Sequence, residues 1–278
     1  MSQIYKSYQH ESNNFDPERI GEYSLAVFLK EGLLIYSILS GEEKILAVKE
    51  YRTQEGLEMQ DFLDSVLEEE QLLQKSFSKV RVIYGVDDFS LLPSALFDRK
   101  FSSEFARILI KDDTDADQIN ISELAHGDAV AIYTIPNSLK KHLDACFEDA
   151  EYEPFCRSAI EMGFELANEQ KDLLLVNIFE QQFVITGIKD RALHLCNAYP
   201  FREASDIVYF VQLAADLLKL NPASFQVYLA GEFENDSNLV QQLQKLIPSL
   251  QIPASTLEKT FDTQSDKLPS WKYAFMSY

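Results

Sequence analysis

The sequence predicts an α/β protein built from two similar halves around a cleft. Three strands, a helix, a fourth strand and a further helix follow one another in the first part of the chain, and the same order recurs in the second part. A glycine ends each fourth strand, Gly85 in the first part and Gly231 in the second. The alternative is that short apolar strands resemble one another by chance, but a shared order with shared glycines favours a true repeat.

The first unit follows a polar lead-in. Its strands are short runs rich in β-branched and aromatic residues, separated by turns. They are expected at 23–29, 33–39, 45–51 and 80–84. Between the third and fourth strands, Phe62, Val66 and Leu73 recur with helical spacing and predict a helix over about 59–75. A short helix is expected at 91–97.

The second unit repeats this pattern. Its strands are expected at 173–179, 182–188, 191–199 and 225–230. Apolar residues with helical spacing, such as Val208 and Val211, predict a helix over 206–220. Pro222 ends this helix, because a proline lacks the backbone N–H that a helix needs. A last short helix is expected at 237–246.

The segment between the units predicts a small α+β insertion in the first half, at about 100–157. Its elements are expected as strands at 105–110, 129–135 and 153–157 and helices at 139–147 and 159–168. The acidic loop 112–117 lacks the glycine and the closing glutamate of an EF-hand, so we interpret it as a solvated loop. The expected domains are therefore 1–157, including the insertion, and 158–278.

Composition and charge restrict the partners. Acidic residues outnumber basic ones by 45 to 25, and the net charge is -20, so nucleic acid is not an expected partner. No apolar run is long enough to span a membrane, and the first residues lack the apolar segment of a signal peptide. Cys146, Cys156 and Cys196 show no C-x-x-C spacing. These features predict a cytoplasmic protein.

Common active-site patterns are absent from the sequence. The 9 glycines are too far apart to form a G-x-G-x-x-G motif or a P-loop. The histidines are scattered, without an H-E-x-x-H motif or a Cys-His metal spacing. They are His10, His126, His142 and His194. No G-x-S-x-G elbow occurs either. The sequence therefore predicts no catalytic residue and no metal site.

Element order and two short motifs carry a resemblance to known families. The twice-repeated strand meander, with an insertion between, resembles the actin-like ATPase superfamily, whose fold is ribonuclease H-like. The strand at 132–136 and the helix after it resemble the insertion of pilus-assembly and cell-division actin homologues. The Leu91–Phe97 stretch resembles an uncharacterised bacterial family, domain of unknown function 3822. The resemblance implies a duplicated actin-like fold.

This resemblance also implies where a nucleotide would bind. Actin-like ATPases hold it between two hairpins that each carry D-x-G, where the aspartate orients Mg²⁺ and the glycine admits phosphate. Here the first hairpin has Lys30 and no aspartate, whereas the second has Asn177 in the aspartate's place and Phe179 in the glycine's. Gly231 is one of the two glycines expected beside the adenosine. The resemblance therefore implies a degenerate nucleotide site.

The sequence thus favours a non-catalytic binding or scaffold module with an unidentified protein partner, for which Mg-ATP is not an expected cofactor. One alternative is a nucleotide-binding protein or weak ATPase in which Asn177 and Gly231 are vestiges of the site. Another alternative is an unrelated α/β enzyme in which the similarity of the two units is not a true repeat.

The last residues are unusually apolar for a chain end. We expect Trp271, Tyr273 and Phe275 to alternate along an extended strand and to share one face, docked on the second half. The alternative is that this tail presents its aromatic residues to a partner.

Overall fold

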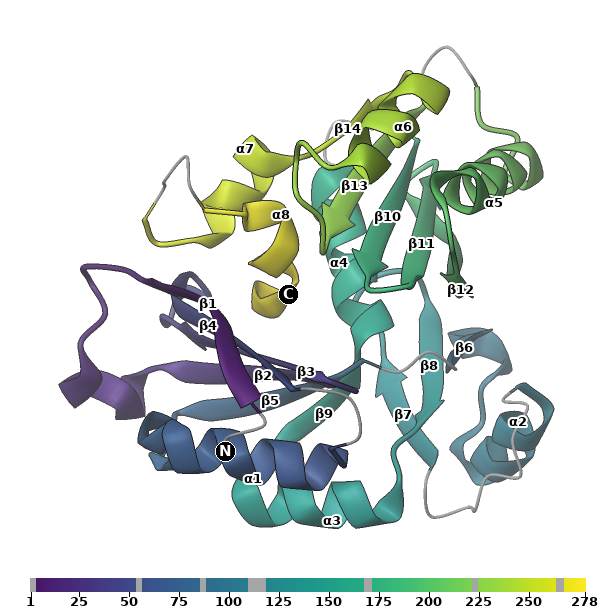
Figure 1. The fold of residues 1–278 in the computed structure, drawn as a ribbon. Helices are drawn as coiled ribbons and strands as arrows, with labels where there is room; N and C mark the ends of the chain where they lie inside the picture. Colours follow the sequence, from purple (N-terminus) through teal and green to yellow (C-terminus); the bar gives the residue numbers. More distant parts are fainter. Residues whose placement is uncertain are drawn as a thin grey trace.

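A computed structural model shows a mixed α/β protein with three sheets (Figure 1). It describes residues 4–53, 57–85, 89–109, 119–167, 172–221, 225–263 and 268–278. The acidic loop predicted at 112–117 lies outside the described residues.

The largest sheet has six strands in the order β1-β4-β3-β2-β5-β9. Their bounds are β1 (Ile4–Glu11), β2 (Ser24–Lys30), β3 (Leu33–Leu39), β4 (Ile45–Thr53), β5 (Lys79–Tyr84) and β9 (Glu151–Pro154). Strands β2, β3 and β4 form an antiparallel meander, whereas β5 runs parallel to β2 and β9 parallel to β5. Helices α1 (Met59–Glu69) and α3 (Asn137–Cys146) lie side by side against one face of this sheet (Figure 1).

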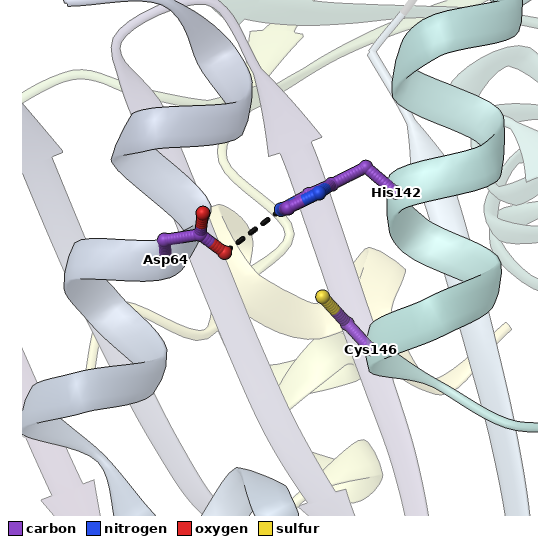
Figure 2. Close-up of side chains that lie close together, drawn as sticks. All are labelled: Asp64, His142 and Cys146. Carbon is purple, nitrogen blue, oxygen red and sulfur yellow. Dashed lines mark hydrogen bonds and ion pairs between the residues drawn. The ribbon is translucent and has the colours of Figure 1, made fainter.

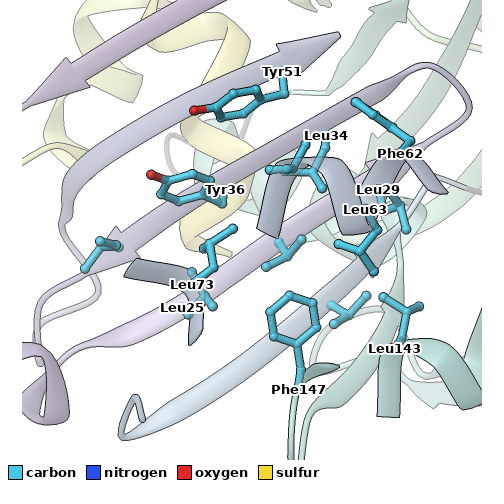
Figure 3. Packing of buried hydrophobic residues seen from close by; sticks show 14 of the residues in the cluster. Leu25, Leu29, Leu34, Tyr36, Tyr51, Phe62, Leu63, Leu73, Leu143 and Phe147 are labelled. Carbon is cyan, nitrogen blue, oxygen red and sulfur yellow. The ribbon is translucent and has the colours of Figure 1, made fainter. Parts of the chain in front are cut away.

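The core of this half forms between that sheet face and the two helices. Figure 3 shows Phe62 and Leu63 of α1 and Leu143 of α3 pointing towards the strands. They pack with Leu29 and Leu34, and each of these five side chains is at most 1% exposed. Because protein interiors are packed closely, these contacts fix the positions of α1 and α3 relative to each other.

The second sheet has the order β12-β11-β10-β13-β14, which is the order of β4-β3-β2-β5-β9 in the first sheet. Its strands are β10 (Leu173–Phe179), β11 (Gln182–Lys189), β12 (Ala192–Pro200), β13 (Gln226–Gly231) and β14 (Leu250–Gln251). Helices α5 (Ala204–Leu217) and α6 (Asn238–Leu246) pack on one face. Helix α4 (Phe155–Leu166) packs on β10, β11 and β12.

The third sheet has the order β6-β8-β7, and its strand β6 lies before the segment 100–157 that the sequence predicts as an insertion. Its elements are β6 (Phe89–Pro93), β7 (Ile119–Glu123) and β8 (Ala129–Thr134), with α2 (Ser102–Leu109) beside them. The strand predicted at 105–110 is wrong, because residues 105–109 lie in the helix α2, and a short apolar run fits a helix as well as a strand. The helix predicted at 91–97 is also wrong in its first half, where Leu91 and Leu92 pair with β8.

Other boundaries differ from the prediction for local reasons. The lead-in contains β1, which pairs with β4 at the sheet edge. The helix predicted over 59–75 ends at Glu69 and a 3₁₀ helix, Gln71–Gln74, follows. At the break, buried Glu70 accepts hydrogen bonds from Tyr36 at 2.9 Å and from Tyr51. The strand predicted at 153–157 ends at Pro154, and α4 begins there.

The C-terminal segment is helical, so the extended strand expected for it is wrong. After α7 (Ala254–Leu257), the chain ends with α8 (Ser270–Tyr273) and a 3₁₀ helix, Ala274–Ser277. Tyr273 and Phe275 are nevertheless buried, at 0% and 2% exposure. The segment contacts strands of the first sheet, β13 of the second sheet and α4, so it does not dock on the second half alone.

Candidate functional site

The two sheets meet at their leading hairpins, β2–β3 and β10–β11. Lys30, the last residue of β2, donates a hydrogen bond from Nζ to Oε1 of Gln182, the first residue of β11, at 2.8 Å. The turns between these strands are the positions at which the resemblance implies phosphate binding. They are therefore joined directly by protein side chains.

Four phenylalanine rings fill the space behind this contact. Phe28, Phe155, Phe179 and Phe275 come from β2, α4, β10 and the C-terminal 3₁₀ helix. Their ring centroids are between 4.8 and 5.8 Å apart in all six pairs. None of the four is more than 5% exposed. We call this group the phenylalanine cluster.

Little free volume remains beside the cluster. A cavity of about 20 Å³ is lined by Phe28, Phe155 and Phe179, together with Lys30 and Gly85. One water molecule needs about 10–15 Å³ of such space, whereas ligand pockets usually measure about 300–1,000 Å³. This cavity is therefore too small for a nucleotide.

Asn177 and Gly231 lie next to each other across β10 and β13, where Asn177 pairs with Ala230 and Ile178 with Gly231. Asn177 is 2% exposed, and no described residue accepts a hydrogen bond from its Nδ2. Gly231 has a φ of 98°, and a Cβ there would overlap the backbone of Ile178. The close approach of the two strands thus explains this glycine without a ligand.

Gly85 lies one residue beyond the position that matches Gly231, because Leu29 pairs with Tyr84 in the first sheet whereas Ile178 pairs with Gly231 in the second. It follows β5, and its N–H donates to the carbonyl of Leu29 at 2.9 Å. In the second half, the N–H of Glu232 donates to the carbonyl of Ile178 at 2.6 Å. A Cβ at Gly85 would come within 2.9 Å of the Lys30 Cβ and 3.0 Å of the Phe28 ring. The predicted equivalence of the two glycines is therefore out by one residue, since the hydrogen bonds match Gly85 with Glu232.

Charged groups connect the first and second sheets next to the hairpins. Arg52, at the end of β4, forms ion pairs with Glu50, with Glu180 at 3.8 Å and with Glu232. Burial and the neighbouring Glu232 raise the pKa of the Glu180 carboxyl, and Arg52 opposes this shift. The guanidinium is thus shared by one carboxylate of β4 and by two that directly follow β10 and β13.

The C-terminal segment is bound to the buried carboxylate of Glu50, which is 1% exposed. Lys272 Nζ lies 2.7 Å from Glu50 Oε2, and the Tyr273 hydroxyl donates to the same oxygen at 2.9 Å. Burial alone would raise the pKa of Glu50, but Lys272, Ser7 and Arg52 hold it below its ordinary value. The carboxylate is therefore charged at neutral pH, and each of its two oxygens has hydrogen-bond or ion-pair partners.

Arg81 of β5 holds the last residues of the segment. It donates to the carbonyl of Met276 at 2.7 Å and to that of Tyr278, and it pairs with Glu153 at 3.1 Å. The Tyr273 ring also stacks on Tyr8, with centroids 4.8 Å apart. These contacts seat Phe275 in the phenylalanine cluster.

The predicted site residues Lys30, Asn177, Phe179 and Gly231 lie at the ends of β2, β10 and β13. The sequence pattern does not identify Phe28, Phe155 and Phe275 as partners of Phe179, because these residues come from separate parts of the chain. The sequence feature that indicates a buried position for Phe275 is the apolar composition of the last residues. Nothing in the sequence pattern pairs Arg52 with Glu232.

Comparisons with known structures show the fold. The chain resembles a protein from Bacteroides thetaiotaomicron with an actin-like ATPase fold and unknown function, with 18% identity over 86% of this chain and 93% of that one and a TM-score of 0.75. It also resembles a chain of the PilM-PilN type IV pilus biogenesis complex, with 14% identity over 91% and 96% of the two chains and a TM-score of 0.63. A search of curated proteins found no match.

Within the described residues, no helix is long and apolar enough to cross a membrane. A family model described as "Protein of unknown function (DUF3822)" matches residues 12–250, which is most of the chain. With the fold of the actin-like ATPases, the chain belongs to this DUF3822 family.

Proposed function

We propose that this chain is a non-catalytic binding or scaffold module whose counterpart of the nucleotide cleft is filled by its own side chains. The phenylalanine cluster is the observation that carries this proposal. Three of its rings come from segments that would border a nucleotide, and the fourth, Phe275, comes from the chain end.

The proposal includes two duplicated halves, residues 1–157 with an insertion at about 100–157 and residues 158–278. The matching strand orders of the two larger sheets support a duplication. Lys30, Asn177, Phe179 and Gly231 would then be the remains of the nucleotide site. The contact of Lys30 with Gln182 supports this assignment, since it joins the two hairpins that a phosphate would separate.

Charge also argues against nucleotide. Glu180 and Glu232 lie beside the hairpins, and each is paired with Arg52. Freed of that pairing, the two carboxylates would repel a triphosphate. The alternative of a weak nucleotide-binding protein rests on Asn177, whose buried Nδ2 has no acceptor among the described residues.

A protein is the partner that we propose. The likeness to a chain of the PilM-PilN type IV pilus biogenesis complex supports this, because that structure is of a protein complex. Along α5, Tyr209, Leu213 and Leu217 are 60%, 38% and 69% exposed and recur every fourth residue on one face. Exposed apolar stripes of this kind are typical of contact surfaces. The three free cysteines suit a cytoplasmic location.

Mg-ATP is expected to leave the melting temperature unchanged and to remain unhydrolysed. A ligand that binds only the folded state, at 100 times its Kd, would stabilise that state by about 2.7 kcal/mol, which a thermal-shift assay detects easily. The assay is run with Mg-ATP, Mg-ADP and Mg²⁺ alone. A saturable rise with nucleotide, or ATP turnover that disappears in Asn177→Ala, would overturn the proposal and favour the weak-ATPase alternative.

A further inference from the structure

Three side chains with metal-binding atoms meet between α1 and α3. Figure 2 shows Asp64 of α1 facing His142 and Cys146 of α3. Nε2 of His142 lies 2.8 Å from Oδ1 of Asp64. One carboxylate oxygen, one ring nitrogen and the thiol sulfur all lie within 4.8 Å of one another.

The helices hold these three residues in place. His142 and Cys146 are four residues apart, so they lie on the same face of α3, one turn from each other. Leu143, next to His142, is fully buried in the core shared with Leu63 of α1. The backbone positions of all three residues are therefore set by core packing.

The chemistry of the donors selects the kind of metal. Zinc binds sulfur at about 2.3 Å and nitrogen or oxygen at about 2.0–2.2 Å, so ligand atoms around a tetrahedral zinc are about 3.3–3.6 Å apart. The group needs only small side-chain rotations to reach this arrangement. Calcium and magnesium prefer sets of oxygen atoms, which these residues do not provide.

We propose that Asp64, His142 and Cys146 form a binding site for Zn²⁺ or a similar divalent transition ion. The three protein ligands leave a fourth position for water or an external ligand. Bound metal would link α1 to α3 and stabilise the first half of the protein. This site is not predicted above, although His142 and Cys146 have a His-x-x-x-Cys spacing within a predicted helix.

An ion can reach the site from solvent. The side chain of Asp64 is 52% exposed and that of His142 is 28% exposed. Cys146 is partly buried and also lines an open groove of about 570 Å³, formed by segments 73–80 and 145–149. The other two cysteines, Cys156 and Cys196, are buried. In the folded protein, a thiol reagent should therefore react mainly with Cys146.

The experiment titrates full-length protein, purified without a histidine tag, with Co²⁺ and then with Zn²⁺. We expect one Co²⁺ per chain, with visible bands of a tetrahedral site and a near-ultraviolet thiolate-to-cobalt band, both displaced by Zn²⁺. Zn²⁺ should also slow alkylation of Cys146 by iodoacetamide, followed by mass spectrometry. His142→Ala and Cys146→Ser should each weaken binding about tenfold or more.

His194→Ala is the matched control, because His194 is an exposed histidine on β12 in the other half, and it should bind like the unchanged protein. Near-ultraviolet circular dichroism checks that each variant is folded. The proposal is overturned if the cobalt spectrum lacks the thiolate band, or if Cys146→Ser binds as tightly as the unchanged chain. It is also overturned if the unchanged chain binds neither Co²⁺ nor Zn²⁺ while Asp64→Asn lowers stability, since Asp64 and His142 would then form only an ion pair.

Discussion

Deletion of residues 269–278 is expected to lower the free energy of unfolding by about 5 kcal/mol or more, taking about 1.5–3 kcal/mol for each large side chain that loses its burial. Tyr273, Phe275 and Met276 are each at most 2% exposed. Whole domains are typically stable by about 5–15 kcal/mol, so the truncated chain should melt at a much lower temperature or aggregate.

The deletion also exposes charges that the segment now pairs. Glu50 would lose Lys272 and the Tyr273 hydroxyl, and Arg81 would lose the carbonyls of Met276 and Tyr278. A buried charge left without its partner costs about 3–5 kcal/mol if water cannot reach it. Water entering the emptied site would reduce this cost.

The measurement is the melting temperature and urea midpoint of the truncated chain beside the full chain. A synthetic peptide of residues 268–278 should restore part of the lost stability when added in excess. An unchanged melting temperature would contradict the buried position of the segment and favour a tail that contacts a partner instead.

Phe179→Ala is expected to destabilise the protein by about 3–5 kcal/mol, the usual range for removing a buried aromatic side chain. Phe179 contacts three other rings, with centroids 4.8 to 5.6 Å away, and these come from separate elements. The neighbouring strands and α4 prevent a full collapse, so the change enlarges the existing cavity.

Phe101→Ala serves as the matched control for this change, because Phe101 is 54% exposed in the 3₁₀ helix Arg99–Phe101. It should alter stability by less than about 0.5 kcal/mol, as surface substitutions usually do. Both variants are compared by urea unfolding. If Phe179→Ala costs no more than Phe101→Ala, the cluster does not hold the two halves together.

Local sequence patterns predicted much of the fold. The strands expected at 33–39 and 173–179 agree with β3 and β10, because their continuous apolar runs are buried on both faces. The strand predicted at 105–110 is wrong because a short apolar run can form a strand or a helix. In the structure Phe105 lies on a helix and packs on Phe97, a contact that the local pattern does not contain. The extended strand predicted for the C-terminal segment is wrong for a related reason. The conformation of this segment depends on contacts with residues distant in sequence, such as Glu50 and Arg81.

The candidate site was predictable only in part. The resemblance directed attention to Phe179 and Asn177, since a hairpin position can be found from the strand pattern. The rings that pack on Phe179 could not be predicted, because Phe28 and Phe275 lie far from it in sequence. The group of Asp64, His142 and Cys146 could not be predicted for the same reason, because Asp64 lies on α1 and Cys146 on α3, far apart in sequence.

The central claim is that side chains of this protein occupy the space that a nucleotide would need. A crystal structure of the full chain, grown with Mg²⁺ and a non-hydrolysable ATP analogue, tests it most directly. We expect the rings of Phe28, Phe179 and Phe275 to remain in contact, Lys30 to remain bonded to Gln182, and no nucleotide to lie between the hairpins. A nucleotide bound there, with Phe275 and the C-terminal segment displaced, would contradict the claim.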